Sequence, residues 1–172
     1  MNFPKEIPTN KAWKYAQTEW ERTFLLKAPP LDISHLPFKQ LEDNYLKHSQ
    51  MRLRKAFDGT NTYFKLSKKV QLQSQSQQWV SSIYLNSTEY ELFVHLPAYY
   101  LKKSRYYFRS EDGISIGLDH IKLKDKELWL AEIEFSSKQE LRSFIPAFDF
   151  IREVSEESSF AGVKLAQSYS SP

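Results

Sequence analysis

Two pairs of glutamates in this sequence have the spacing of residues that share one face of a strand. Glu19 and Glu21 lie in TEWERTFLL, and Glu132 and Glu134 lie in LWLAEIEF. Alternate residues of an extended strand point to the same side, so each pair would present two carboxylates together. Carboxylate oxygens are the ligands that hard divalent cations such as Mg²⁺ or Mn²⁺ prefer. The spacing therefore makes both pairs candidate metal ligands.

Basic residues alternate in the same way on three other segments. These segments are MRLRK with Arg52 and Arg54, KLSKK with Lys65 and Lys69, and LKKSRYYF with Lys103 and Arg105. Arginine binds phosphate groups through two parallel hydrogen bonds, and lysine binds them as a compact charge. The pattern indicates a polyanion as the partner of these strands. The basic residues are interleaved with acidic strands rather than forming one basic stripe, which argues against nucleic acid.

Alternation and turn signals predict the elements that would carry these residues. We expect strands at 18–26, 50–57, 63–70, 79–85, 101–108, 114–121 and 128–135. Helices are expected at 86–97, where Asn86 and Glu89 have capping-box spacing, and from Ser137, with Glu140 three residues on. We interpret 27–49 as a proline-broken loop, 71–78 as a polar linker and the part from Pro146 as mixed.

The charged faces of the strands allow two interpretations. Charges normally lie on the solvent side of a sheet, so the strands could form an ordinary sheet with a polar outer face. Alternatively, the charges could line the inside of a closed barrel whose apolar outer face is covered by helices. Charges inside a barrel are costly unless they pair or bind ions, so that arrangement requires a wet interior and a charged ligand.

Composition excludes several classes of protein. The chain has 172 residues, 41% hydrophobic and 26% charged, which fits one folded domain. We expect an extension at 1–17, with a possible short helix at 11–17, followed by a single domain at 18–172. There is no cysteine, which excludes disulfides and Cys-ligated zinc, and only 4 glycines, which disfavours a glycine-rich phosphate loop. No apolar run approaches the roughly 20 residues that span a bilayer, so we expect a cytoplasmic protein without a membrane partner.

Several segments, in order along the chain, resemble the motifs of one family, the CYTH superfamily of triphosphate tunnel metalloenzymes. The matching segments are EWERTFLL, MRLRK, KLSKK, KKSRYY, GLDHI with the AEIEF that follows it, and IREVSEES. The resemblance implies an α+β fold, an eight-stranded antiparallel closed barrel with helices packed outside. It also implies a small molecule with a triphosphate group as partner, and Mg²⁺ or Mn²⁺ as cofactor.

The resemblance also implies a role for each charged residue. Lys103 would organise the attacking water or act as a base, and Asp119 would orient a cation or contact the metal. The phosphate ligands would be Arg52, Arg54, Lys69 and Arg105, with Lys65 added because it alternates with Lys69. The metal ligands would be Glu19, Glu21, Glu132 and Glu134.

The sequence departs from the family pattern at two places. Thr23 stands where the motif has lysine, and Gln78, Val80 and Ser82 stand where the family commonly has an arginine and two glutamates. The expected function is a metal-dependent hydrolase of inorganic tripolyphosphate or a small organic triphosphate. A polyphosphate- or nucleotide-binding protein without catalysis is the alternative, and a class IV type adenylyl cyclase is a third possibility. A monomer or a homodimer is expected.

Overall fold

The fold is taken from a computed structural model that describes residues 14–72, 74, 76–110, 113–124 and 126–169. Part of the possible helix at 11–17 lies outside these residues. Its described part is not helical, because Lys14 and Tyr15 form a turn and the first strand begins at Gln17.

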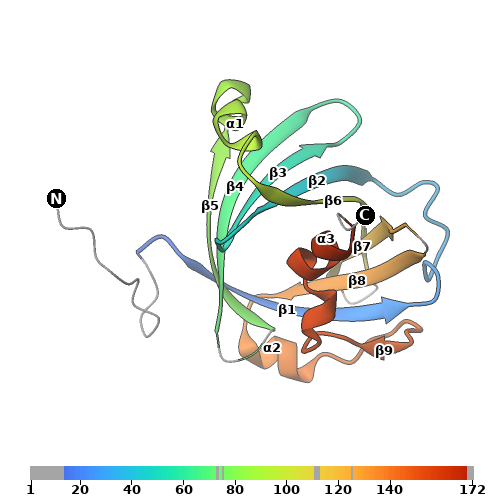
Figure 1. Cartoon of the computed structure of the whole chain (residues 1–172). Coiled ribbons are helices and arrows are strands. Elements are labelled where there is room, and N and C mark those ends of the chain that lie inside the picture. The colour runs from blue at the N-terminus through green and yellow to red at the C-terminus, as the bar shows by residue number, and fades with distance from the viewer. Residues whose placement is uncertain (1–13, 73, 75, 111–112, 125, 170–172) are drawn as a thin grey trace.

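Eight antiparallel strands close into a barrel, as the resemblance implied (Figure 1). Their order around the barrel is β5-β4-β3-β2-β6-β7-β8-β1, and β1 pairs with β5 to complete the circle. The bounds are β1 Gln17–Leu26, β2 Phe38–Leu46, β3 Met51–Phe57, β4 Thr62–Gln71, β5 Gln77–Leu85, β6 Ala98–Arg109, β7 Ser115–Lys122 and β8 Glu127–Phe135. The interpretation of the charged faces as the lining of a barrel is therefore the one that the structure supports.

Strand β2 is the main correction to the sequence-based elements. It lies inside the segment interpreted as a loop, and it begins directly after Pro37. The strand pairs with β3 on one edge and β6 on the other, so the barrel would be open without it. Its Glu42-Asp43-Asn44 centre is poor in strand-forming residues, and pairing on both edges overrides that weak local preference. The polar linker is also shorter than expected, because β4 extends to Gln71 and β5 begins at Gln77.

Two helices pack against the outside of the barrel. Helix α1, Ser87–Val94, has the expected capping box, in which the Asn86 side chain and the Glu89 side chain each bind the other's backbone N–H. Helix α2, Lys138–Ser143, is capped by Ser137, whose hydroxyl accepts from the Glu140 N–H at 3.2 Å. The Glu140 carboxylate accepts from Ser136 instead of Ser137, so this box is only half formed.

The apolar faces of the strands point outward and are covered. Phe24 of β1 is fully buried and packs edge-on against Phe144, Phe148 and Phe150 of the segment after α2. On the opposite wall, Tyr90 of α1 covers an apolar cluster on β3 and β4. Burial of these outward faces leaves the alternate, charged residues for the interior.

The mixed C-terminal part forms β9, Arg152–Glu153, a 3₁₀ turn, Ser158–Phe160, and helix α3, Gly162–Tyr169. Strand β9 pairs with the end of β1 that β5 leaves open, and Glu153 forms an ion pair with the outward-facing Arg22. Helix α3 lies over one end of the barrel (Figure 1) and packs Leu165 and Ala166 onto Leu101. This apolar cluster therefore covers part of this end of the barrel. None of the helices in the described ranges is long and apolar enough to cross a membrane.

Candidate functional site

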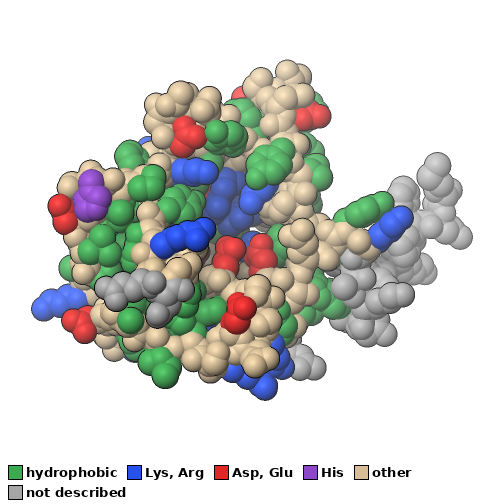
Figure 2. All heavy atoms as spheres, turned by 180° about the vertical axis from the view of Figure 1, so that it is seen from behind, with side chains coloured by type: hydrophobic (Ala, Val, Ile, Leu, Met, Phe, Trp, Pro, Cys, Tyr) green, Lys and Arg blue, Asp and Glu red, His purple; other side chains and the backbone are tan. Residues whose placement is uncertain are grey.

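The interior of the barrel is a charged cavity of about 400 Å³. It is lined by ten of the residues selected from the sequence: Glu19, Glu21, Arg52, Arg54, Lys65, Lys69, Lys103, Arg105, Glu132 and Glu134. Figure 2 shows the hollow from the side opposite α3, with basic side chains in its depth and acidic side chains along one side. Strand register brings the acids together, since Glu21 lies directly opposite Glu134 on the β1–β8 pair.

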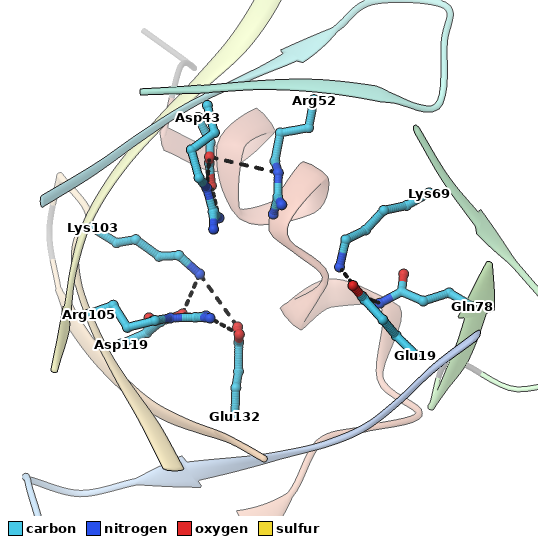
Figure 3. A network of polar contacts seen from close by, with 10 residues as sticks. Glu19, Asp43, Arg52, Lys69, Gln78, Lys103, Arg105, Asp119 and Glu132 are labelled. Atoms are coloured by element: carbon cyan, nitrogen blue, oxygen red, sulfur yellow. Dashed lines mark hydrogen bonds and ion pairs between the residues drawn. The ribbon is translucent and has the colours of Figure 1, made fainter. Parts of the chain in front are cut away.

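Asp119 is on the inward face of β7 but is fully buried beneath Arg105 and Lys103, so it does not line the cavity itself. Its two oxygens accept from Arg105 Nε and Nη2 at 2.6 and 2.7 Å, and it also forms an ion pair with Lys103 (Figure 3). Arg105 and Lys103 both reach Glu132 as well, Lys103 at 3.5 Å. These cations hold the pKa of Glu132 well below its usual range, despite burial. The arrangement favours an orienting role for Asp119 over direct contact with a metal.

Asp43 is a second buried carboxylate, and sequence reasoning missed it. Its oxygens accept from Arg54 Nε and Nη2 at 2.6 and 2.7 Å, so it orients Arg54 as Asp119 orients Arg105. Arg54, Arg52 and the bond to Arg54 lower the pKa of Asp43 despite its burial. The signal was present in the alternation of Leu41, Asp43 and Tyr45, but it was hidden because the segment was interpreted as a loop.

Arg52 has an unsatisfied donor. Its Nε is buried, lies 3.8 Å from Asp43 Oδ1, and has no hydrogen-bond acceptor among the described residues. Lys65, on the neighbouring strand, has a pKa lowered by burial and by the positive charges of Arg52 and Arg54. This wall of the cavity thus carries closely spaced positive charge and one buried donor, which suits an anion with several oxygen atoms.

Glu19 faces Lys69 across the β1–β5 side of the cavity. Lys69 Nζ donates to Glu19 Oε2 at 2.8 Å, and Gln78 Nε2 donates to the same oxygen at 3.4 Å (Figure 3). Gln78 occupies a position where the family commonly has arginine, and it contributes to the cavity without charge. Strand β5 supplies no carboxylate, and the Ser82 hydroxyl bonds the Ser67 hydroxyl at 2.8 Å.

Glu21, Glu132 and Glu134 form the acidic corner of the cavity. Burial, followed by the charge of Glu132, raises the pKa of Glu21 to about 7, although Lys69 and Arg105 oppose the shift. Carboxylates crowded in this way repel one another, and a bound divalent cation would relieve that repulsion. The described residues contain no cluster of three or more His, Asp or Glu already placed for a metal. The oxygen-donor set nevertheless fits Mg²⁺ or Mn²⁺ in its chemistry.

Solved structures with the same architecture include triphosphatases. The inorganic triphosphatase NE1496 is 28% identical with a TM-score of 0.58, and the match covers 86% of this chain and 93% of that one. A second structure of NE1496 gives 27% identity and a TM-score of 0.60, covering 88% and 99%. HpAC1 from Hippeastrum, described as an adenylyl cyclase with a dominant triphosphatase activity, is 12% identical with a TM-score of 0.52, covering 72% and 82%. No protein-family model and no curated protein matches the sequence.

The protein therefore has the triphosphate-tunnel fold of the CYTH superfamily. This confirms the resemblance inferred from the motifs. It also accounts for the sorted strand faces, because in this fold the inward face of each strand lines the tunnel.

Proposed function

We propose that this protein is a metal-dependent hydrolase of inorganic tripolyphosphate or a small organic triphosphate. The observation that carries the proposal is the opposition of two walls inside one tunnel. Arg52, Arg54 and Lys65 form a basic wall, and Glu21 and Glu134 belong to an acidic corner across from it. The name of the similar protein NE1496 supports an activity on triphosphates.

The basic residues would hold the polyanion. Arg54 and Arg105 are each oriented by a buried aspartate that binds two of the guanidinium nitrogens. This leaves the Nη1 atom of each guanidinium group free of the aspartate and available to phosphate oxygens. Such fixed donors position the phosphate chain and neutralise charge that develops during in-line attack by water.

The acidic corner would hold the cofactor. Glu21, Glu132 and Glu134 are the proposed metal ligands, with Glu19 adjacent. Bound there, Mg²⁺ or Mn²⁺ would supply charge neutralisation of the phosphate oxygens. Lys103 would organise the attacking water or act as its base, and the carboxylates of Asp119 and Glu132 fix the position of its ammonium group.

A binding protein without catalysis is the second candidate. Strand β5 carries Val80 and Ser82 where the family commonly has glutamates, and Thr23 replaces the motif lysine opposite Glu132. These departures remove one carboxylate pair and one cation from the tunnel. The only partner that we expect is the triphosphate compound. The cytoplasmic location and the oligomeric state, a monomer or a homodimer, remain predictions.

One assay separates the two candidates. Purified protein is incubated with tripolyphosphate, ATP or thiamine triphosphate, with Mg²⁺, Mn²⁺ or EDTA, and released phosphate and cyclic AMP are measured. We expect phosphate release with at least one substrate and one metal, and none in EDTA. Binding of tripolyphosphate without phosphate release under any of these conditions would contradict the hydrolase and leave the binding protein.

A further inference from the structure

Among the described residues, the arginines that line the cavity are not all held in the same way. Arg54 and Arg105 each bind a buried aspartate through two nitrogens. Arg52 lines the cavity beside Arg54, but its Nε lies 3.8 Å from Asp43 and is left without an acceptor within the described ranges (Figure 3). Because Asp43 is already taken by Arg54, another neighbour has to fix the plane of the Arg52 guanidinium group.

Tyr45 is the neighbour that the strand register supplies. It lies directly opposite Arg52 on the β2–β3 pair, and both side chains line the cavity. Directly opposite residues on one face of an antiparallel pair have Cβ atoms about 5 Å apart, so a phenol and a guanidinium group can meet there. Burial, followed by the charge of Asp43, raises the pKa of Tyr45 to about 12, although Arg52 opposes the shift through its charge and a hydrogen bond. The phenol therefore stays neutral at pH 7 and can accept from Arg52 without adding charge to the cavity.

Helix α3 holds Tyr45 from the other side. The tyrosine packs against the apolar cluster that contains Leu165 and Ala166. Its ring also fills the space beside Gly162, because a Cβ on that residue would lie 2.9 Å from Tyr45 Cζ and nearer still to the hydroxyl oxygen. Gly162 does not have the positive φ that Gly59 has, so its own backbone does not require glycine. The absence of a side chain at the start of α3 is required instead by the position of the phenol.

We propose that Tyr45 is a positioning residue that orients Arg52 toward the phosphate chain, and that Gly162 of α3 keeps the phenol in place. The role of Arg52 as a phosphate ligand comes from the proposed function, on which this inference rests. Tyr45 does for Arg52 what the buried aspartates do for Arg54 and Arg105. The start of α3 thereby contributes to phosphate binding, although the residues that it places at the cavity, Gly162 and Val163, carry no charge.

A double-mutant cycle between Tyr45 and Arg52 tests the positioning role. Tripolyphosphate affinity is measured by calorimetry in EDTA, so that neither turnover nor metal binding contributes. Tyr45→Phe keeps the ring and removes the hydroxyl, and we expect it to weaken binding about tenfold, the loss of one hydrogen bond to a charged group. In an Arg52→Lys background the same change should weaken binding about twofold or less, because a flexible ammonium group has no plane to be fixed.

Two further variants examine the seat of the phenol. Gly162→Ala should weaken tripolyphosphate binding as Tyr45→Phe does, because the added methyl group displaces the phenol, and the two changes together should cost less than the product of their separate effects. Tyr99→Phe is the matched control. Tyr99 lies directly opposite Tyr45 on the β2–β6 pair and packs on the same cluster, but it does not line the cavity. Its substitution should leave the affinity unchanged.

The outcomes separate this inference from the proposed hydrolase. An unchanged affinity in Tyr45→Phe, or an equal loss in the wild-type and Arg52→Lys backgrounds, would overturn the positioning role, even in a protein that releases phosphate. Coupling between Tyr45 and Arg52 in a protein that releases no phosphate with Mg²⁺ or Mn²⁺ would support the positioning role and contradict the hydrolase. Failure of the wild type to bind tripolyphosphate would overturn both. The cycle with Arg52 decides the matter even if Gly162→Ala does not fold.

Discussion

Asp119, which is fully buried, binds Arg105 through both of its oxygens, in a contact between the neighbouring strands β6 and β7. Because Asp119 is shielded from solvent, water cannot replace Arg105 as its hydrogen-bond partner. This contact fixes the plane of the guanidinium group, and with it the direction of the nitrogens that remain for a ligand. Asp43 and Arg54 repeat the arrangement on the adjoining strands β2 and β3.

We expect Asp119→Asn to lower the free energy of unfolding by about 3 kcal/mol, because it leaves buried positive charge without its main partner. Glu132 compensates only part of this charge, since it is itself shared between Lys103 and Arg105. Urea denaturation measures the change. Asp149→Asn, at an exposed aspartate, is the control and should stay within about 0.5 kcal/mol of the wild type. A similarly small effect at Asp119 would mean that the ion pair contributes little to stability.

The low pKa of Asp43 leads to a prediction about the stability of the fold at low pH. In the folded state this pKa lies below its ordinary value of 3.8, so the ionised carboxylate stabilises the fold. The contribution is complete well above pH 3.8 and is lost as the pH falls toward the folded-state pKa. The stability difference between wild type and Asp43→Asn should therefore narrow by about 1 kcal/mol from pH 7 to pH 3. Urea titrations at several pH values test this, and a constant difference would contradict it.

The acidic corner can be tested through metal binding. We expect Glu21→Gln combined with Glu134→Gln to weaken Mn²⁺ binding at least tenfold, about 1.4 kcal/mol. Stability at pH 8 should not fall, since burial and the charge of Glu132 already disfavour ionised Glu21 in the folded state. Glu91→Gln on α1, an exposed glutamate, serves as the control for calorimetry. Unchanged Mn²⁺ affinity in the double variant would remove these residues from the proposed site.

The proposed catalytic role of Lys103 can be tested by comparing its substitution with the same substitution at the neighbouring Lys102. Lys103→Ala should reduce kcat about 100-fold, the range of one acid–base or electrostatic group in the transition state. Tripolyphosphate affinity should fall much less, because the arginines still hold the polyanion. Lys102→Ala is the matched control, since Lys102 is half-exposed on the outer face and pairs with Glu42 at 3.9 Å. Equal losses in kcat and affinity at Lys103 would make it one binding cation among several.

Much of the fold could be read from the sequence because strand alternation is a local property. The pattern at Glu132 and Glu134, or at Arg52 and Arg54, selects one face of a strand whatever its partners are. Seven of the eight barrel strands and the capped start of α1 followed from such local signals. Strand β2 and helix α3 did not, since both depend on neighbours distant in the chain. Gly162 illustrates this, because a Cβ there would lie 2.9 Å from Tyr45 Cζ, a contact that the helix sequence alone does not reveal.

The sequence by itself determined which charges share a face, and the motifs it carries indicated the tunnel. Only the tertiary structure decided how those charges are paired. It placed Asp119 and Asp43 behind the arginines, left Glu21 among other acids, and brought Lys39 close to the rings of Tyr63 and Tyr107. The physical reason is that alternation fixes only the side to which a residue points. Which residues meet across the tunnel depends on strand register and on the closure of the barrel, which involve the whole chain at once.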